Sequence, residues 1–583
     1  MSLNLYFLDE LNALRQAGRR FSERNPALAP FLGQRGQDPD IERLLEGVAF
    51  LTGRLRQKLD DELPELTHSL MHLLWPNFMR PVPAVTLAQF STADSYARIE
   101  RGLEVRSKEV AGAFCRFRTI YPVDISPLEI EQLDYIVGGA STMFKLRLST
   151  GSSGLTECAL DSLRLCFADS IAGKELFRAL MTQLKAARLT LLTSSGAELA
   201  SSALPVDCVG VVGFDEQEAL FPYPQNAFRG YRLLQEYFAY EQKFMFVDVL
   251  GMNALHRFPE AELAQASDFE LCFELAGPAG HGVRPVREDV LLRCTPLVNL
   301  FNADGHPVRP DGRSNSLEVG LKYEAHSQTK VFSVDRVYAT APGGAGEVEF
   351  VSFESFRHNG NARDGQQASV PYYSTYLTPT ADTGGFATYL RLNRSGSGIG
   401  VVSTELTCTD GDLPSQLGAG AVCEYSQGSE LAPFKNLTIV TPGYAPPLHT
   451  DFLWNVISSM SLNYVSLANL GALRAILETY DFPRYYRPEA KRLSEARLAA
   501  LTDIRHCHVD RLHRGLPIRG IRTELKADPA GFGGEGGLYL FGCVLNEFFA
   551  LYASLNSFHE LCLHSTQGEV YQWKPRMGQQ PLL

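Results

Sequence analysis

Residues 38–83, DPDIERLLEGVAFLTGRLRQKLDDELPELTHSLMHLLWPNFMRPVP, encode two amphipathic helices together with their start and stop signals. Asp38 can cap the first helix, and Pro39 is suited to its first turn. Apolar residues recur along this helix at helical spacing: Ile41, Leu44, Leu45, Val48, Leu51, Leu55 and Leu59. Pro64 opens a second helix, which Pro76 closes. Each helix therefore carries an apolar stripe that needs a partner surface.

The length and composition of the chain exclude several classes of protein. At 583 residues it exceeds the roughly 250–300 residues at which a single core stops growing, so several domains are expected. Hydrophobic residues at 45% and charged residues at 21% are typical of a folded globular protein and argue against disorder. The net charge of −12 opposes non-specific nucleic-acid binding, which needs a positive surface.

The cysteines and the N-terminus argue against secretion. The 11 cysteines are odd in number, scattered and without a C-x-x-C pair, which predicts reduced core residues. The first residues lack the basic region and apolar core of a secretory signal. The best candidate for a membrane span, residues 538–555, is interrupted by Asn546 and Glu547. The sequence thus predicts a protein that does not insert directly into a membrane.

The hydrophobic period changes along the chain and predicts a multidomain α+β fold. We expect an N-terminal helical bundle segment, β-rich middle domains and a mixed α/β C-terminal region. The expected divisions are a helical segment at 1–88, a mixed domain at 89–260, a β-rich domain at 261–450 and an α+β region at 451–583. Alternating apolar residues predict strands at 143–148, 163–167, 269–275, 386–392 and 401–408. Helical patterns occur at 174–192, 454–467, 470–477 and 538–555, and a hairpin is expected at 560–573.

No cluster of residues indicates catalysis or a bound cofactor. The carboxylates of residues 60–65 suit a solvated elbow between two helices better than Mg²⁺ binding. His506, Cys507 and His508 resemble a zinc site only weakly, because a second paired half is missing, and a polar strand or turn is the alternative. The glycine-rich loops fit neither phosphate-binding motif. We therefore predict no catalytic residue, no cofactor, no metal site and no small-molecule substrate.

The segment at residues 480–488 combines tyrosines and arginines. Tyr485, Tyr486 and Arg487 are candidate interface residues, since both residue types are enriched at binding hot spots. The same residues could stack on nucleic-acid bases or pack as a loop on their own domain. Because the chain is acidic, we expect no nucleic acid among its partners.

Blocks along the whole chain resemble one protein family. They are Tyr6 with residues 9–11, residues 38–52 and 58–66, and residues 115–119 (CRFRT), 230–238 (GYRLLQEYF), 294–301 (CTPLVNLF), 461–467 (SLNYVSL) and 551–558 (LYASLNSF). In this order and length they are similar to the TssF (VasA/ImpG) family of type VI secretion baseplate subunits. The resemblance implies a structural wedge component of a contractile injection machine, without enzymatic activity.

The resemblance also implies partners and a location. It implies two copies of this chain with one TssG, joined by TssK and TssE around the VgrG spike. The complex would lie in the cytoplasm, at the inner-membrane-docked baseplate of a Gram-negative bacterium. The stripe residues Leu44, Val48, Leu51, Leu55 and Leu59 would then enter a bundle with TssG and the second copy. The alternative is a cytoplasmic enzyme or carbohydrate-binding protein with a site in the β-rich region.

Overall fold

A computed structural model of the chain contains two compact units, Met1–Leu74 and Trp75–Leu583. In the first unit it describes residues 7–8, 10–15, 17, 39–40, 42–54 and 71. In the second unit it describes residues 76–583 without 94–95, 140, 151–154, 156–159, 224–228, 281, 311–315, 323–327, 341–346, 354–370, 381–384, 394–399, 427–430, 449–468, 514–515, 551–552, 554–556 and 579–583.

The described part of the first unit is helical. Residues 10–15 and 42–54 both adopt helix, and the second range lies within the helix that the apolar spacing predicts. Leu11 and Ala49 are buried, with 5% and 0% of their surface exposed. Arg15 Nη2 donates to Glu42 Oε2 at 2.7 Å, which ties the two helical segments together. The second predicted helix and the carboxylates of residues 60–65 lie outside the described residues, apart from the helical Met71.

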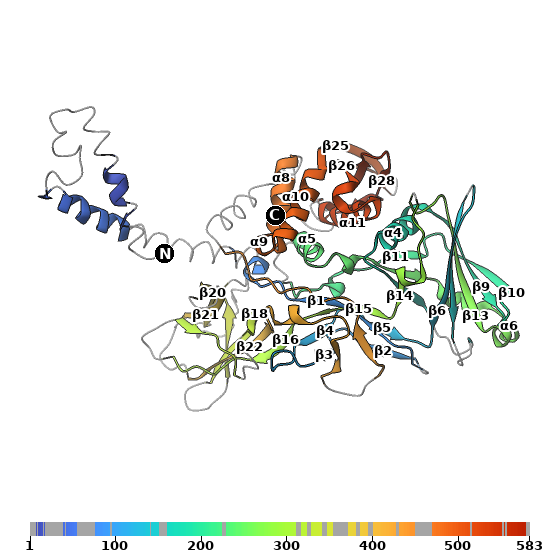
Figure 1. Ribbon diagram of the computed structural model, residues 1–583, viewed down its shortest axis with the longest axis horizontal. Helices are drawn as coiled ribbons and strands as arrows, with labels where there is room; N and C mark the ends of the chain where they lie inside the picture. Colours follow the sequence, from blue (N-terminus) through green and yellow to red (C-terminus); the bar gives the residue numbers. More distant parts are fainter. Residues whose placement is uncertain are drawn as a thin grey trace. The chain divides into compact units, whose positions relative to one another are not determined.

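The second unit is rich in strands, so the chain has the mixed α+β, multidomain, strand-rich class that the sequence predicts (Figure 1). A six-stranded sheet has the order β23 (Val422–Tyr425), β3 (Glu104–Ser107), β4 (Arg116–Thr119), β15 (Cys294–Val298), β1 (Val85–Phe90), β24 (Phe434–Asn436). A five-stranded sheet has the order β10 (Glu198–Leu204), β9 (Leu184–Leu192), β13 (Asp268–Leu275), β7 (Thr142–Ser149), β6 (Glu129–Val137). A four-stranded sheet has the order β11 (Val209–Val211), β12 (Phe246–Leu250), β8 (Ser162–Phe167), β14 (Val290–Leu292).

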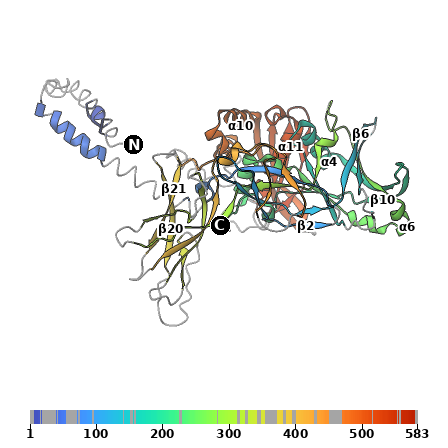
Figure 2. The same cartoon turned by 60° about the horizontal axis from the view of Figure 1, so that its bottom comes forward.

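The remaining described strands form three further sheets. Strands β20 and β21 of the first of these sheets are labelled in Figure 2. The seven-stranded sheet has the order β16 (Phe301–Asp304), β22 (Val402–Thr409), β18 (Lys330–Thr340), β19 (Glu347–Ser352), β20 (Tyr372–Pro379), β21 (Phe386–Asn393), β17 (Ser316–Glu318). Strands β2 (Ala97–Ile99) and β5 (Val123–Ile125) form a pair. The C-terminal sheet has the order β25 (Leu501–His513), β26 (Leu516–Ala527), β27 (Phe558–Ser565), β28 (Val570–Gln572), with β29 (Arg576–Met577) on β27.

The described helices of the second unit are few. They are α4 (Ile171–Gln183), α5 (Arg229–Ala239), α6 (Glu260–Gln265), α8 (Leu470–Tyr480), α9 (Pro483–Tyr486), α10 (Pro488–Ala500) and α11 (Glu535–Ala550), besides short 3-10 turns. Helix α4 begins where the Ser170 hydroxyl accepts the N–H of Gly173 at 2.9 Å. Helix α11 is apolar on nearly all sides and is correspondingly buried. Its N-terminal Gly536 N–H donates to Glu175 Oε1 of α4 at 2.8 Å, so one helix caps another.

The six-stranded sheet joins segments that are far apart in the sequence. Strand β1 pairs antiparallel with β15 on one side and with β24 on the other. Its buried residues form a core with those of the neighbouring strands, including Phe90, Phe117, Leu297 and Phe434. The chain therefore returns to one sheet from three distant places. The predicted divisions near residues 88, 260 and 450 stay predictions.

A buried amide links the six-stranded and seven-stranded sheets. Asn299, which follows β15, donates from Nδ2 to Asp410 Oδ2 and to the carbonyl of Arg116, both at 2.7 Å. Its Oδ1 accepts from the Thr409 hydroxyl and the Asp410 N–H, again at 2.7 Å. Asn299 and Asp410 are 0% and 1% exposed. The amide thus uses all four of its ordinary hydrogen-bonding positions at this junction.

Most of the predicted elements are present, and one is wrong in its second half. Strands β7, β8, β13, β21 and β22, helix α8 and the β27–β28 hairpin are confirmed, and α11 begins earlier than predicted. The predicted helix at 174–192 ends at Gln183, and Leu184–Leu192 is strand β9. β9 lies between β10 and β13, so its backbone pairs on both sides. Sheet pairing overrides the local helical pattern there. The pattern at 454–467 lies outside the described residues.

Candidate partner-binding surfaces

The apolar stripe predicted on the first helix is exposed on the chain by itself. Leu44, Val48 and Leu51 are 69%, 45% and 67% exposed. At about 100° per residue, these three positions share one side of the helix, whereas Ala49 on the other side is fully buried. The helix therefore buries one side within its own unit and presents apolar residues on the other. Leu55 and Leu59, the remaining predicted members of this stripe, lie outside the described residues.

The tyrosine and arginine segment forms the short helix α9 and the turn into α10. Tyr485 and Tyr486 are 37% and 44% exposed, and Arg487 is exposed. Both tyrosines also contact their own unit. Tyr485 Oη donates to the carbonyl of Glu478 at 3.3 Å, and Tyr486 Oη donates to that of Ala445 at 2.8 Å. The Tyr486 ring stacks on Tyr444, with ring centroids 5.7 Å apart.

These contacts give the segment two properties at once. Its hydroxyl groups and rings hold α9 on its own unit, as the structural alternative for this loop predicts. Burial raises the pKa of both phenols to about 12, so they stay protonated donors at neutral pH. More than a third of the surface of each tyrosine is nevertheless exposed to solvent. The role of these residues as an interface stays a prediction.

A buried carboxyl lies directly beside this segment. Asp481, at the C-terminal end of α8, is 5% exposed. Burial raises the pKa of its carboxyl to about 6, although a hydrogen bond with Ser494 and the charges of Arg497 and Arg484 act in the opposite direction. The α8–α9–α10 corner therefore contains a group whose charge changes in mildly acidic solution.

Stability of the corner should depend on pH through Asp481. Because its pKa is about 6 in the folded chain and about 4 in an unfolded one, Asp481 binds a proton on folding between these values. The free energy of unfolding should therefore fall by about 2–3 kcal/mol as the pH rises from 4 to 6. Asp481→Asn should remove this component.

The measurement is thermal or denaturant unfolding of the wild type and of Asp481→Asn between pH 4 and 7. The difference between the two proteins isolates Asp481 from other titrating groups. Glu489→Gln, at an exposed position of α10, is the matched control and should follow the wild type. An Asp481→Asn protein with the same pH dependence as the wild type would contradict this assignment.

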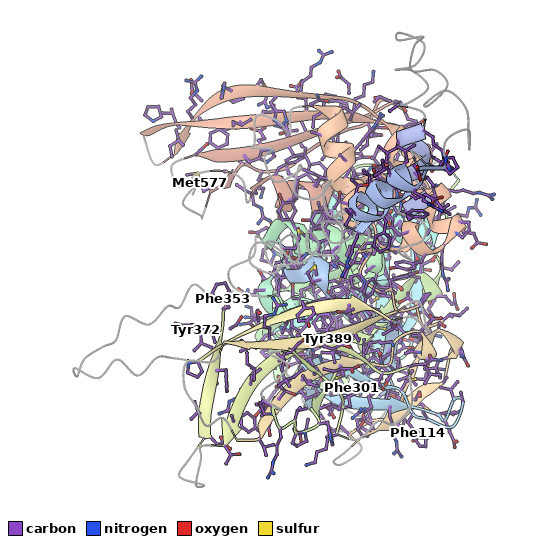
Figure 3. All side chains as sticks on the ribbon, turned by 90° about the vertical axis from the view of Figure 1, so that its left-hand side faces the viewer. Phe114, Phe301, Phe353, Tyr372, Tyr389 and Met577 are labelled. Carbon is purple, nitrogen blue, oxygen red and sulfur yellow. The ribbon has the colours of Figure 1, made fainter. Side chains whose placement is uncertain are left out.

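Sequence reasoning did not identify the aromatic face of β20 and β21. Tyr376 and Tyr389 stack at 5.4 Å between centroids, and the Arg391 guanidinium lies 5.4 Å from the Tyr376 ring centroid. Phe353, 58% exposed, meets Tyr372 edge-on at 6.5 Å, and Figure 3 labels Phe353, Tyr372 and Tyr389. The sequence contained a signal for this face. Tyr372, Tyr376 and Tyr389 lie in strand segments, and aromatic side chains on neighbouring strands often pair.

The histidine and cysteine cluster is part of a regular strand. His506, Cys507 and His508 lie in β25, as the alternative to a zinc site predicts. The Thr523 hydroxyl lies 3.0 Å from His506 Nδ1 and 2.8 Å from His559 Nε2. Within the described ranges, no group of three or more His, Cys, Asp or Glu side chains is placed to hold a metal ion. In that same part of the chain, no helix is both long and apolar enough to cross a membrane.

Exposed apolar and aromatic surfaces on a strand-rich framework are typical of a subunit of a larger assembly. Comparison with known proteins identifies the family to which the chain belongs. The family model "Type VI secretion system, TssF" matches residues 1–580. The type VI secretion system component TssF1 of Pseudomonas aeruginosa is 29% identical over 630 aligned residues, which cover 99% of each chain.

Two solved structures extend the match to three dimensions. One is a TssK-TssF-TssG baseplate subcomplex of the type VI secretion system, solved by cryo-electron microscopy. A chain of that subcomplex has a TM-score of 0.76 and 30% identity, covering 93% of this chain and 99% of its own length. The other is the baseplate complex of the type VI secretion system, with a TM-score of 0.59, 25% identity and full coverage of both chains.

The chain belongs to the TssF family of the type VI secretion system. The predicted function as a baseplate subunit of that system is thereby confirmed. The matched relatives are structural components of a protein complex.

Proposed function

We propose that this chain is a structural wedge component of the baseplate and carries out no chemical step. Two copies assemble with one TssG, and TssK and TssE join them around the VgrG spike. This wedge supports assembly of the tube and sheath and so the delivery of effectors. It acts in the cytoplasm, at the inner-membrane-docked baseplate of a Gram-negative bacterium. The solved complexes that match the chain support TssK and TssG as its partners.

The exposed stripe of Leu44, Val48 and Leu51 carries this proposal. Apolar residues left on one side of a helix whose other side is already buried favour association with further helices. Their spacing of four and then three residues is that of a helical bundle seam. In the wedge, this stripe packs against TssG and the second copy, and Leu55 and Leu59 extend it.

The rest of the chain has a different role in this proposal. The β-rich middle of the chain forms protruding arms, and the region at 451–583 adds the surface of Tyr485, Tyr486 and Arg487. Half-exposed tyrosines beside an arginine suit an interface centre, because they bury large area at low entropic cost.

The mass of the complex tests this function. Co-expression of the chain with tagged TssG, followed by size exclusion with light scattering, should yield a stable species with two copies of this chain per TssG. The chain expressed alone should be less soluble than the complex, because its stripe is uncovered. A well-behaved monomer that ignores TssG would contradict the proposal.

A further inference from the structure

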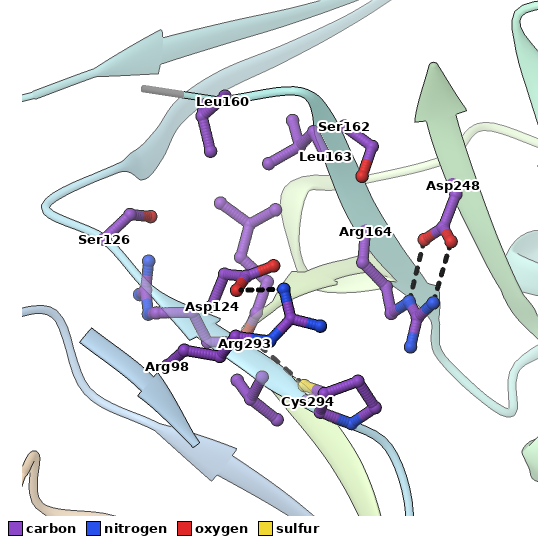
Figure 4. A pocket seen from close by; sticks show the side chains of 13 residues that line it. Arg98, Asp124, Ser126, Leu160, Ser162, Leu163, Arg164, Asp248, Arg293 and Cys294 are labelled. Carbon is purple, nitrogen blue, oxygen red and sulfur yellow. Dashed lines mark hydrogen bonds and ion pairs between the residues drawn. The ribbon is translucent and has the colours of Figure 1, made fainter. Parts of the chain in front are cut away.

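A polar cavity of about 120 Å³ lies where three groups of strands meet. Its walls come from the β2–β5 pair, from β8 and β12 of the four-stranded sheet, and from residues at the start of β15. Figure 4 shows the charged and hydroxyl side chains that line it. Since one water occupies roughly 30 Å³ of liquid, this volume accommodates a few waters or one tetrahedral oxyanion.

The lining carries three guanidinium groups against two carboxylates. Arg164 forms two hydrogen bonds of 2.7 Å with the carboxylate of Asp248. Arg98 Nη1 lies 3.3 Å from Asp124 Oδ1. Asp248 is thus paired with Arg164, and Asp124 is paired with Arg98. Arg293 is the cation of the lining that is not paired with a carboxylate of the lining.

Glu100 and Glu218 lie near these two ion pairs, and neither of them lines the cavity. Glu100 lies 3.4 Å from Arg98 with 76% of its side chain exposed, so solvent and salt screen its charge. Glu218 lies 3.9 Å from Arg164, and its Oε2 accepts the N–H of Gly213 at the other side of its carboxylate. Each lies beside a cation that is already paired with a carboxylate of the lining.

Arg293 forms no salt bridge with any described carboxylate, although the more distant charge of Glu129 acts on its guanidinium. Its Nε donates to the carbonyl of Phe90 at 3.1 Å, and Nη1 donates to the carbonyl of Leu128. Burial lowers the pKa of its guanidinium, which reflects the cost of holding the charge away from water. Arg293 also has a φ of +54°, a left-handed conformation that is unfavourable for a residue with a side chain. Strain of this kind persists where the surrounding structure imposes it.

Unused hydrogen-bond donors face the same space. Arg164 Nη1 is buried and has no hydrogen-bond partner among the described residues. The hydroxyls of Ser126 and Ser162, both in the lining, make no hydrogen bond to any described residue. Ser126 is only 4% exposed. A buried donor without an acceptor costs free energy, so these groups favour a ligand that only accepts hydrogen bonds.

We propose that this cavity binds one tetrahedral oxyanion, phosphate or sulfate, between Arg293, Arg164 Nη1 and the hydroxyls of Ser126 and Ser162. The anion compensates the charge of Arg293, which has no salt bridge to a described carboxylate, and accepts the N–H and O–H donors. It thereby joins the β2–β5 pair to the four-stranded sheet and the start of β15. The site is independent of the stripe and of the proposed contacts with TssG.

Thermal unfolding of the full chain, alone or with TssG, tests the site with inorganic phosphate against chloride at matched ionic strength. At a phosphate concentration of about ten times Kd, we expect phosphate to raise the unfolding midpoint by roughly 1–2 °C. Ser126→Ala should weaken phosphate binding about tenfold, measured by titration calorimetry. Ser201→Ala, at an exposed position of β10, is the matched control and should bind phosphate like the wild type.

Ser126→Asp gives a second, independent test, because it places a carboxylate where we expect the anion. If the cavity is an anion-binding site, this variant should keep its unfolding midpoint in chloride and should no longer respond to phosphate. If the cavity holds only water, the buried carboxylate should lower the midpoint and phosphate should have no effect on the wild type either, which would overturn the proposal.

Glycerol 3-phosphate distinguishes the source of the oxyanion. A response to inorganic phosphate alone indicates a free ion, and an equal response to glycerol 3-phosphate indicates the phosphate group of a larger molecule. No response of the wild type to either compound, or to sulfate, would contradict the site.

Discussion

Replacing Leu44 and Leu51 together by aspartate should abolish co-purification of this chain with TssG. Both side chains are about two-thirds exposed in the chain itself, at 69% and 67%, so the change removes little packing within the folded unit. In the complex, each leucine would contribute about 1.5–3 kcal/mol of apolar burial. Each aspartate adds the cost of a buried charge without a partner. The sum corresponds to a loss of more than about 1000-fold in affinity.

The measurement is pull-down from co-expression, with the dissociation constant determined by calorimetry where complex remains. Arg43→Asp with Arg54→Asp is the control, because it adds two aspartates to the same helix about a quarter of a turn from the stripe. This control should bind TssG within a fewfold of the wild type. A Leu44→Asp, Leu51→Asp protein that keeps its far-UV circular dichroism and binds TssG normally would show that the stripe is not the interface.

Asn299→Ala should lower the stability of the second unit by about 3–5 kcal/mol, the largest effect we expect from one substitution. The change removes four hydrogen bonds of 2.7 Å at a position with no exposed surface. It also takes the amide donor from the buried carboxylate of Asp410, which keeps the Arg116 N–H at 3.0 Å. The penalty is large because a buried carboxylate loses one of its hydrogen-bond donors.

Thermal unfolding measures this effect, and a fall in the midpoint of roughly 3–5 °C is expected for a unit of this size. Asn302→Ala is the matched control, since Asn302 is an exposed residue of the neighbouring strand β16. It should change the midpoint by no more than about 0.5 °C. An Asn299→Ala protein as stable as the Asn302→Ala control would mean that the two sheets are held together elsewhere.

Features that repeat along a short stretch could be predicted from the sequence. Alternation identified β7 and β13, whose residues point alternately into the core and towards solvent. Helical spacing identified the stripe of Leu44, Val48 and Leu51, because three to four residues per turn bring these positions to one side. The blocks that resemble the TssF family are contiguous in the sequence. The family could therefore also be predicted from the sequence alone.

Features that depend on distant segments could not be predicted in this way. The pattern at Leu184–Leu192 suggests a helix, and only its pairing with β10 and β13 makes it a strand. The aromatic face of β20 and β21 depends on their cross-strand register, which places Tyr376 opposite Tyr389. Local propensity is worth less than the hydrogen bonds and burial that such neighbours supply.

The sequence by itself determined the family, the α+β class and the apolar stripe, because each depends on residues close together in the chain. Only the tertiary structure decided that β1, β15 and β24 share a sheet, that Asn299 bonds to Asp410, and that Arg293 faces a polar cavity. These features unite residues separated by more than one hundred positions. Their contacts arise when sheets pack together, and no local period in the sequence records them.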